Sequence, residues 1–130
     1  MAKTFFMLGS AFAGLAVLAG AFGAHALKSR LNPELFEIFE TAVRYHTYHA
    51  LALLAVAWAS TRYAGNFTKF AGWLFVIGII LFSGSLYAYT LTFTNGEGIK
   101  AFVMITPLGG LCFMVGWLLL ALSTRKWSPE

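Results

Sequence analysis

Residues 20–27 read GAFGAHAL and end an apolar run that begins close to Met1. The tripeptide at 24–26 has the small-x-small form of a signal-peptidase site, and Lys3 supplies a short basic region in front of the run. The run over residues 5–27 is longer than the ~7–15 apolar residues of an ordinary signal-peptide core. We therefore interpret it as a permanent membrane-spanning helix.

The composition of the chain is that of a membrane protein. Of its 130 residues, 59% are hydrophobic and 11% are charged, with a mean hydropathy of +0.75. Soluble domains carry about a quarter charged residues. A helix needs ~20 apolar residues to cross a hydrocarbon core ~30 Å thick. The sequence predicts an all-α integral membrane four-helix bundle, a single domain over residues 1–130 with spans at about 5–27, 42–63, 70–91 and 101–122.

The segment before the second predicted span has the features of a helix start. Asn32 suits the cap, Pro33 suits the first helical position, and three glutamates before residue 41 favour the positive end of the helix dipole. No Gly or Pro follows until Gly65, so this helix would be about 46 Å long. We expect its first turns to form an amphipathic interfacial segment leading into the second span. Asn95-Gly96 predicts a turn before the last span.

The basic residues bear on membrane orientation. The net charge is +4 and the isoelectric point is near 9.5, but the nine Lys and Arg residues are scattered at span ends, so we predict no nucleic-acid partner. An even number of spans places both termini on the side of the second loop, where Trp127 is also expected. That side has five basic residues (Lys3, Arg62, Lys69, Arg125 and Lys126), and the other side has four (Lys28, Arg30, Arg44 and Lys100). The positive-inside rule then favours both termini in the cytoplasm.

Small residues mark the faces by which the spans are expected to pack. Membrane helices associate by close approach, because lipid tails are as apolar as Leu, and small residues permit that approach. Gly9, Gly20 and Gly23 lie on one face of the first span, which we expect to be packed centrally. We expect Gly20→Leu or Gly23→Leu to disrupt assembly. In the last span, Pro107 removes a backbone donor and should kink the helix, beside Gly109 and Gly110.

Several kinds of chemistry have no support in the sequence. Asp is absent, and none of the five Glu residues lies deep in a span, whereas charge-coupled transporters usually place a carboxylate or base there. Residues 83–85 read SGS and lack the glycine frame of a nucleophile elbow, and no His-Glu-x-x-His occurs. Cys112 is the only cysteine, so neither an intramolecular disulfide nor a cysteine-based metal site is predicted. We predict a protein that is not an enzyme and has no cofactor.

Three histidines remain as candidates for chemistry. His25 ends the first span, and His46 and His49 share one stripe of the second helix with apolar residues. All three could converge at one membrane face, where Glu37 or Glu40 could complete a metal site. The alternative is a polar cluster in which the histidines bond backbone carbonyls or nearby tyrosines. Its members are His25, Glu40, Arg44, Tyr45, His46 and His49, with Tyr48 as a further tyrosine, and Glu40 and Arg44 are spaced for a surface ion pair.

Four ordered motifs carry a resemblance to a known family. They are GAFGAHAL at 20–27, TAVRYHTYHAL at 41–51, LFSGSLY at 81–87, and TPLGG at 106–110 followed by Gly116-Trp117. Together they resemble the YgdD/YwdK-type family of small bacterial inner-membrane proteins, a domain of unknown function with eukaryotic transmembrane relatives. The resemblance implies a four-helix protein of the bacterial inner membrane and supplies no activity. His25, His49, Gly84, Pro107, Gly109 and Gly110 match the family pattern. Relatives can carry Gln in place of His46, which fits a polar cluster better than a metal site.

Three functions are open at this point. The first is a non-catalytic structural or accessory bundle that forms a homo-oligomer or joins another membrane protein. The second is an oligomeric small-molecule or ion pathway between protomers, lined by uncharged polar groups such as Ser83, Ser85, Thr106 and the histidines. The third is a metal or haem site that uses His25 and His49 as ligands.

Overall fold

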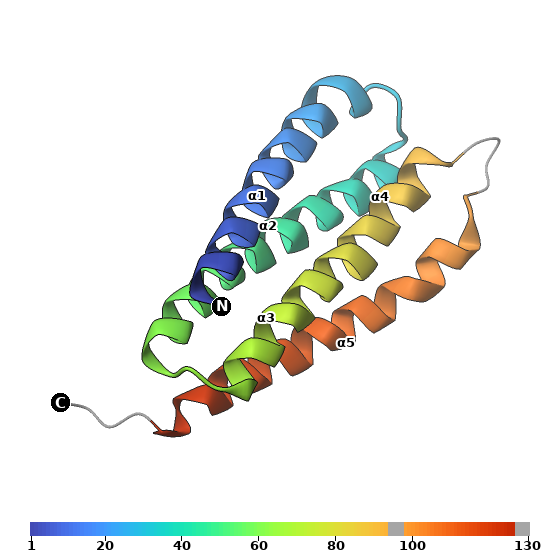
Figure 1. Cartoon of the computed structure of the whole chain (residues 1–130). Coiled ribbons are helices and arrows are strands. Elements are labelled where there is room, and N and C mark those ends of the chain that lie inside the picture. The colour runs from blue at the N-terminus through green and yellow to red at the C-terminus, as the bar shows by residue number, and fades with distance from the viewer. Residues whose placement is uncertain (94–97, 127–130) are drawn as a thin grey trace.

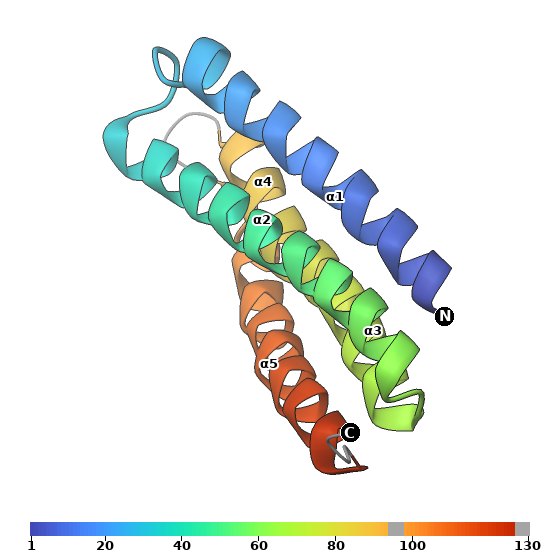
Figure 2. The same ribbon diagram turned by 90° about the vertical axis from the view of Figure 1, so that its left-hand side faces the viewer.

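The computed structural model describes residues 1–93 and 98–126. Within these residues the chain is helical and contains no strand, which confirms the all-α prediction. Four long helical segments lie side by side, and consecutive segments run in opposite directions (Figures 1 and 2). The turn predicted at Asn95-Gly96 and the position expected for Trp127 lie outside the described residues.

The first two segments form a hairpin. The first consists of α1 (Ala2–Phe22) and a π-helical turn (Gly23–Leu27), so the quoted stretch GAFGAHAL continues the helix in a wider turn. The second is α2 (Pro33–Arg62), a single helix of 30 residues. Residues 28–32 connect the two segments.

The third segment packs against α2 on one side and against the fourth segment on the other. The third consists of α3, a second π-helical turn and α4, with the bounds Asn66–Gly78, Ile79–Ser83 and Gly84–Leu91. The fourth is α5 (Lys100–Ser123), which continues through Pro107 and ends in a short 3-10 turn (Thr124–Lys126).

The helix start predicted at Asn32 is confirmed. The Asn32 side chain accepts a hydrogen bond from the N–H of Leu35 at 2.8 Å, and Pro33 occupies the first helical position. In the first turns of α2, Leu35 and Phe39 are buried while the three glutamates are exposed. This opening segment is therefore amphipathic, as expected, and it is continuous with the rest of α2.

Three helical segments are long and apolar enough to cross a membrane: Ala2–Leu27, Asn66–Leu91 and Lys100–Ser123. They coincide with three of the four predicted spans. α2 lies alongside them but is not among the three, because its charged and imidazole side chains lower its hydropathy. Residues 42–63 as a membrane-crossing segment therefore stay a prediction.

The prediction that the first helix is packed centrally is wrong, because α2 holds that place. Twelve residues of α2 are buried and only three of α1. α2 packs against α1 on one side and against the third segment on the other, whereas the large apolar side chains of α1 point outward. The core joins all four segments and includes Phe5, Leu53, Val56, Phe75 and Phe113.

The predicted packing positions differ in how closely the helices approach them. A Cβ on Gly9 would lie 2.9 Å from Leu54, and one on Gly23 would lie 2.8 Å from Phe39, both in α2. A Cβ on Gly109 would meet the backbone of Phe82. The remaining positions are looser: Gly20 and Gly110 make ordinary contacts, Gly84 meets only its own helix, and Pro107 is exposed.

Candidate functional site

His49 lies at the centre of the best-connected polar site in the bundle. Its side chain is 5% exposed, its Nδ1 lies 2.8 Å from the carbonyl oxygen of Tyr45, and its Nε2 lies 3.2 Å from Nε1 of Trp117. A carbonyl oxygen can only accept and an indole N–H can only donate. Nδ1 therefore carries the proton and Nε2 accepts, which fixes a neutral ring in one tautomer.

Aromatic rings enclose the His49 imidazole. It stacks on Phe113 of α5 with ring centroids 3.4 Å apart and planes inclined by 7°, and Phe75 of α3 lies 5.6 Å away. The indole of Trp117 in turn packs edge-on against Phe75 at 5.0 Å. His49 thus contacts α5 through one hydrogen bond and a stacked ring, and α3 through the ring of Phe75, while its other hydrogen bond lies within α2.

His46 lies one turn before His49 and has different neighbours. Its Nδ1 lies 3.2 Å from the hydroxyl oxygen of Tyr87 in α4, and Phe12 of α1 meets its ring edge-on at 5.6 Å. The side chain is 6% exposed, and its Nε2 is buried with no hydrogen-bond partner among the residues that the structure describes. His46 therefore links α2 to α1 and α4 but leaves one ring nitrogen without a bond.

The tyrosine partners differ from those expected. Tyr45 contributes its backbone carbonyl to His49, while its exposed ring packs on Phe82 with centroids 4.6 Å apart. Tyr48 is exposed. The hydroxyl that bonds a histidine belongs to Tyr87, in a different helix. Sequence reasoning did not assign Tyr87 or Trp117 to the cluster, although both occur in the motifs quoted above and Trp117 stands one helical turn after Phe113.

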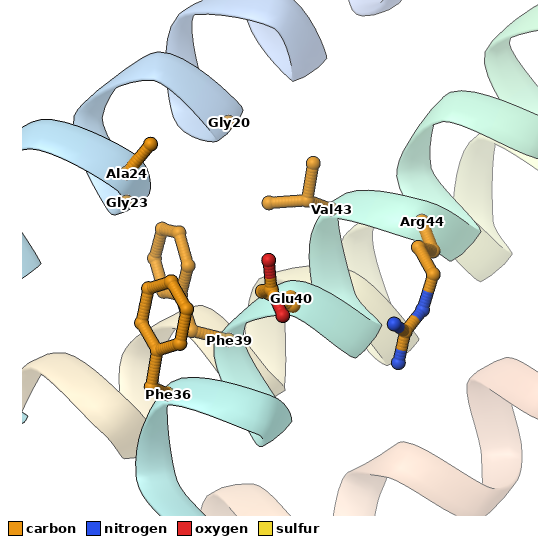
Figure 3. Close-up of a pocket in the computed structure, with 8 residues that line it drawn as sticks. All are labelled: Gly20, Gly23, Ala24, Phe36, Phe39, Glu40, Val43 and Arg44. Atoms are coloured by element: carbon orange, nitrogen blue, oxygen red, sulfur yellow. The ribbon is translucent and has the colours of Figure 1, made fainter. Parts of the chain in front are cut away.

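The other members of the predicted cluster lie apart from the two buried histidines. His25 is exposed in the first π-helical turn. Glu40 and Arg44 are exposed on α2, where they help to line a cavity of about 170 Å³ beneath the end of the first segment (Figure 3). Across residues 1–93 and 98–126, no group of three His, Cys, Asp or Glu side chains is arranged to hold a metal ion.

The ion pair expected between Glu40 and Arg44 is not formed among the described residues. Arg44 instead donates to the hydroxyl of Thr41 at 2.9 Å, one turn back along the helix. The Arg44 side chain extends away from Glu40 in Figure 3. On an exposed helix face such a pair gains little, so the nearer hydroxyl competes with the carboxylate for the guanidinium.

The uncharged serine and threonine side chains named for a pathway belong to the third segment and to α5. The hydroxyls of Ser85 and Thr106 lie 2.7 Å apart and hydrogen-bond each other. Ser83 is fully buried in the second π-helical turn, and its hydroxyl has no partner in the part of the chain that the structure describes. Ser85 and Thr106 thus tie neighbouring helices together.

Comparison with known proteins assigns the chain to a family. The model of the protein family of unknown function DUF423 matches residues 19–110. The chain belongs to this family. It is 40% identical over 126 residues to the UPF0382 membrane protein YwdK of Bacillus subtilis (strain 168), covering 96% of this chain and 98% of YwdK. It is 43% identical over 124 residues to the UPF0382 membrane protein SSP2132 of Staphylococcus saprophyticus, covering 95% and 98% of the two chains.

These matches confirm the resemblance to YwdK-type proteins and establish that the chain is a membrane protein. The family description gives no activity. No solved structure matches the chain. The segment matched by the DUF423 model contains both buried histidines and Tyr87 but ends before Phe113 and Trp117. The environment of His49 therefore extends beyond that segment.

Proposed function

We propose that this DUF423 protein is a non-catalytic helix bundle of the bacterial inner membrane. It has a structural or accessory role and associates with itself. The bonding of His49 carries the proposal. A general base or a metal ligand needs a ring nitrogen with an available lone pair. In His49 one nitrogen is bonded to the Tyr45 carbonyl and the other to the Trp117 indole, so the imidazole serves helix packing.

The same bonds argue against a haem or metal site that uses His25 and His49. A metal at Nε2 of His49 would have to displace the indole of Trp117, which itself packs against Phe75. His25 is exposed at the end of the first segment. A structural role accounts for the contacts of His49 without any such rearrangement.

The outer face of α1 supports self-association. Ser10, Gly14 and Ala21 are exposed and share this face at helical spacing, and a Cβ on Gly14 would meet nothing within 4 Å. Small residues four apart permit close approach between membrane helices. Gly23 already packs against Phe39 within the same chain, so a substitution at Gly23 tests the fold of the protomer rather than its assembly.

Gly14→Leu tests this association. The wild-type protein is extracted in a mild detergent and its protomer number is read by native mass spectrometry. We expect an oligomer that Gly14→Leu weakens, while Ala121→Leu, which adds bulk at an exposed position of α5, leaves it intact. A wild-type monomer, or an oligomer unaffected by Gly14→Leu, contradicts the proposal.

The distribution of charge supports a cytoplasmic location of both termini. Five basic residues belong to the end with the termini and four to the other end, and the positive-inside rule places the end with more Lys and Arg in the cytoplasm. A phosphatase reporter that works only outside the cytoplasm, fused after Glu130, should be inactive. An active fusion would place the C-terminus outside the cytoplasm and contradict this orientation.

A small-molecule pathway is the second candidate function, and one observation favours it. Nε2 of His46 and the hydroxyl of Ser83 are both buried without a partner among the described residues. Buried polar atoms are normally satisfied by protein or by ordered water, so these two atoms are available to a small polar solute. Flux measured in liposomes against protein-free vesicles tests this candidate, and no flux across a broad panel of ions and neutral solutes removes it.

A further inference from the structure

A second hollow lies at the opposite end of α2 from the one in Figure 3. Its volume is about 570 Å³, and it is lined by residues 62–68, which connect α2 to α3, and by Leu122, Ser123 and Arg125 at the end of α5. Figures 1 and 2 both show the α2–α3 connection beside the end of α5. Three helix ends therefore form this cavity at one face of the bundle.

The cavity carries positive charge that no described carboxylate neutralises. Arg62 closes α2 and Arg125 follows α5, and both are exposed and line the cavity. Lys69 stands one turn further along α3. The described chain contains glutamates only at 34, 37 and 40, in the first turns of α2, and the rise of the helix places them about 33 to 42 Å from Arg62.

The start of α3 adds hydrogen-bond donors to the same cavity. Its cap, Gly65, has no side chain to accept from the first turn, and the first helical bond runs from Lys69 N–H to the Gly65 carbonyl at 3.1 Å. Thr68 points its hydroxyl toward the Tyr63 carbonyl at 2.8 Å and so does not cap the helix. The N–H groups at the start of a helix have no intrahelical acceptor and favour an anion.

From these residues we infer that the cavity binds a phosphate group, with Arg62 and Arg125 as its main ligands. Guanidinium groups pair with phosphate oxygens through two parallel N–H donors, which makes Arg well suited to this anion. Phe67 and Leu122 add apolar lining beside the charged groups. The combination fits the headgroup and glycerol of an acidic phospholipid, and the same groups suit free inorganic phosphate. This inference does not depend on self-association or on the role of His49.

Native mass spectrometry of the full chain, stripped of lipid in detergent, tests the inference. Phosphatidylglycerol, zwitterionic phosphatidylcholine and inorganic phosphate are each added in turn. We expect phosphatidylglycerol to be retained and phosphatidylcholine to be released at lower collision energy. If millimolar inorganic phosphate displaces phosphatidylglycerol, the site binds phosphate from either source; if it does not, the site is specific for the lipid.

Charge-neutral variants locate the site. Arg62→Gln and Arg125→Gln should each weaken phosphatidylglycerol binding by about tenfold or more, as expected for loss of a charged hydrogen-bond donor. Arg30→Gln is the matched control, because it removes the same charge from an exposed position at the other end of the bundle. Equal binding by all three variants and the wild type would overturn the inference, as would no binding of any phosphate probe.

Gly65→Asp separates loss of the site from loss of the fold. Gly65 has an extended backbone with φ −176°, which any residue adopts, and a Cβ there would meet nothing closer than 3.9 Å. An Asp at the cap would place a carboxylate on the free N–H groups, which stabilises the helix and repels an anion. We expect weaker phosphatidylglycerol binding together with an unchanged or raised melting temperature, and Gly65→Ala should retain the lipid. Full binding by Gly65→Asp would contradict the site.

Discussion

The indole N–H of Trp117 in α5 donates to Nε2 of His49 in α2, across 68 positions of sequence and a distance of 3.2 Å. The bond lies within the membrane protein's helix bundle, where lipid provides no hydrophobic force to drive helices together. Packing and polar bonds between helices must supply that association. The His49–Trp117 pair provides both, because the imidazole also stacks on Phe113.

Trp117→Phe should destabilise the bundle. The substitution keeps an aromatic ring but removes the N–H donor, which leaves Nε2 of His49 buried without its partner. The expected loss is ~1 kcal/mol in the free energy of unfolding, the size of an interhelical hydrogen bond in a membrane. Unfolding by a denaturing detergent, followed by circular dichroism, measures it.

Trp58→Phe is the matched control for that measurement. Trp58 is 59% exposed on α2, and its ring meets Tyr63 edge-on at 6.1 Å. We expect its unfolding midpoint to stay within error of the wild type. Equal effects of the two substitutions would mean that the His49–Trp117 bond contributes nothing specific.

Asn32→Ala should weaken the start of α2. The Asn32 side chain satisfies the N–H of Leu35 at 2.8 Å, and loss of such a cap costs ~1 kcal/mol. Asn32→Asp keeps an acceptor at the same place and should restore the wild-type midpoint. Amide exchange at Leu35 reports the effect locally, and unchanged protection in Asn32→Ala would contradict a capping role.

The cap and the helices could be predicted from the sequence because both depend on local chemistry. Asn32 followed by Pro33 is a local signal for a helix start, and three apolar runs of spanning length require helices in lipid. The central place of α2 was not predicted. Small residues on α1 indicated close packing, but they do not show how many neighbours a helix has.

The candidate site could be predicted only in part for the same reason. The helical period placed His46 and His49 on the buried stripe, and both are buried. Their partners Tyr87 and Trp117 come from other helices, and the sequence does not state which residues of two helices stand at the same depth. Glu40 and Arg44 failed as a pair because Thr41 offered a nearer acceptor to the guanidinium.

Glu40→Gln tests whether Glu40 and Arg44 interact. Glu40 is exposed, and Arg44 donates to Thr41, so removal of the carboxylate charge should change the free energy of unfolding by less than ~0.5 kcal/mol. A double-mutant cycle with Arg44→Gln should give additive effects. A coupling energy above ~0.5 kcal/mol would show that Glu40 and Arg44 do form the surface ion pair that their spacing predicts.

Gly109→Ala should destabilise the protein and Gly110→Ala should not, although the positions are adjacent. A Cβ on Gly109 would meet the backbone nitrogen and Cα of Phe82, which cannot move without shifting the second π-helical turn, whereas the nearest atom to a Cβ on Gly110 is 3.8 Å away. Overpacking at Gly109 should cost ~1–3 kcal/mol. At Gly110 the higher helix propensity of Ala, worth ~0.5–1 kcal/mol, should appear as unchanged or higher stability.

The pair of glycine variants is informative because the added methyl group is identical in both. Melting temperatures of the two purified variants, recorded side by side in one detergent, give the comparison directly. If both variants melt like the wild type, Gly109 of α5 does not lie in close contact with the backbone of Phe82. If both fall equally, the loss reflects the flexibility of this part of α5 rather than contact with Phe82.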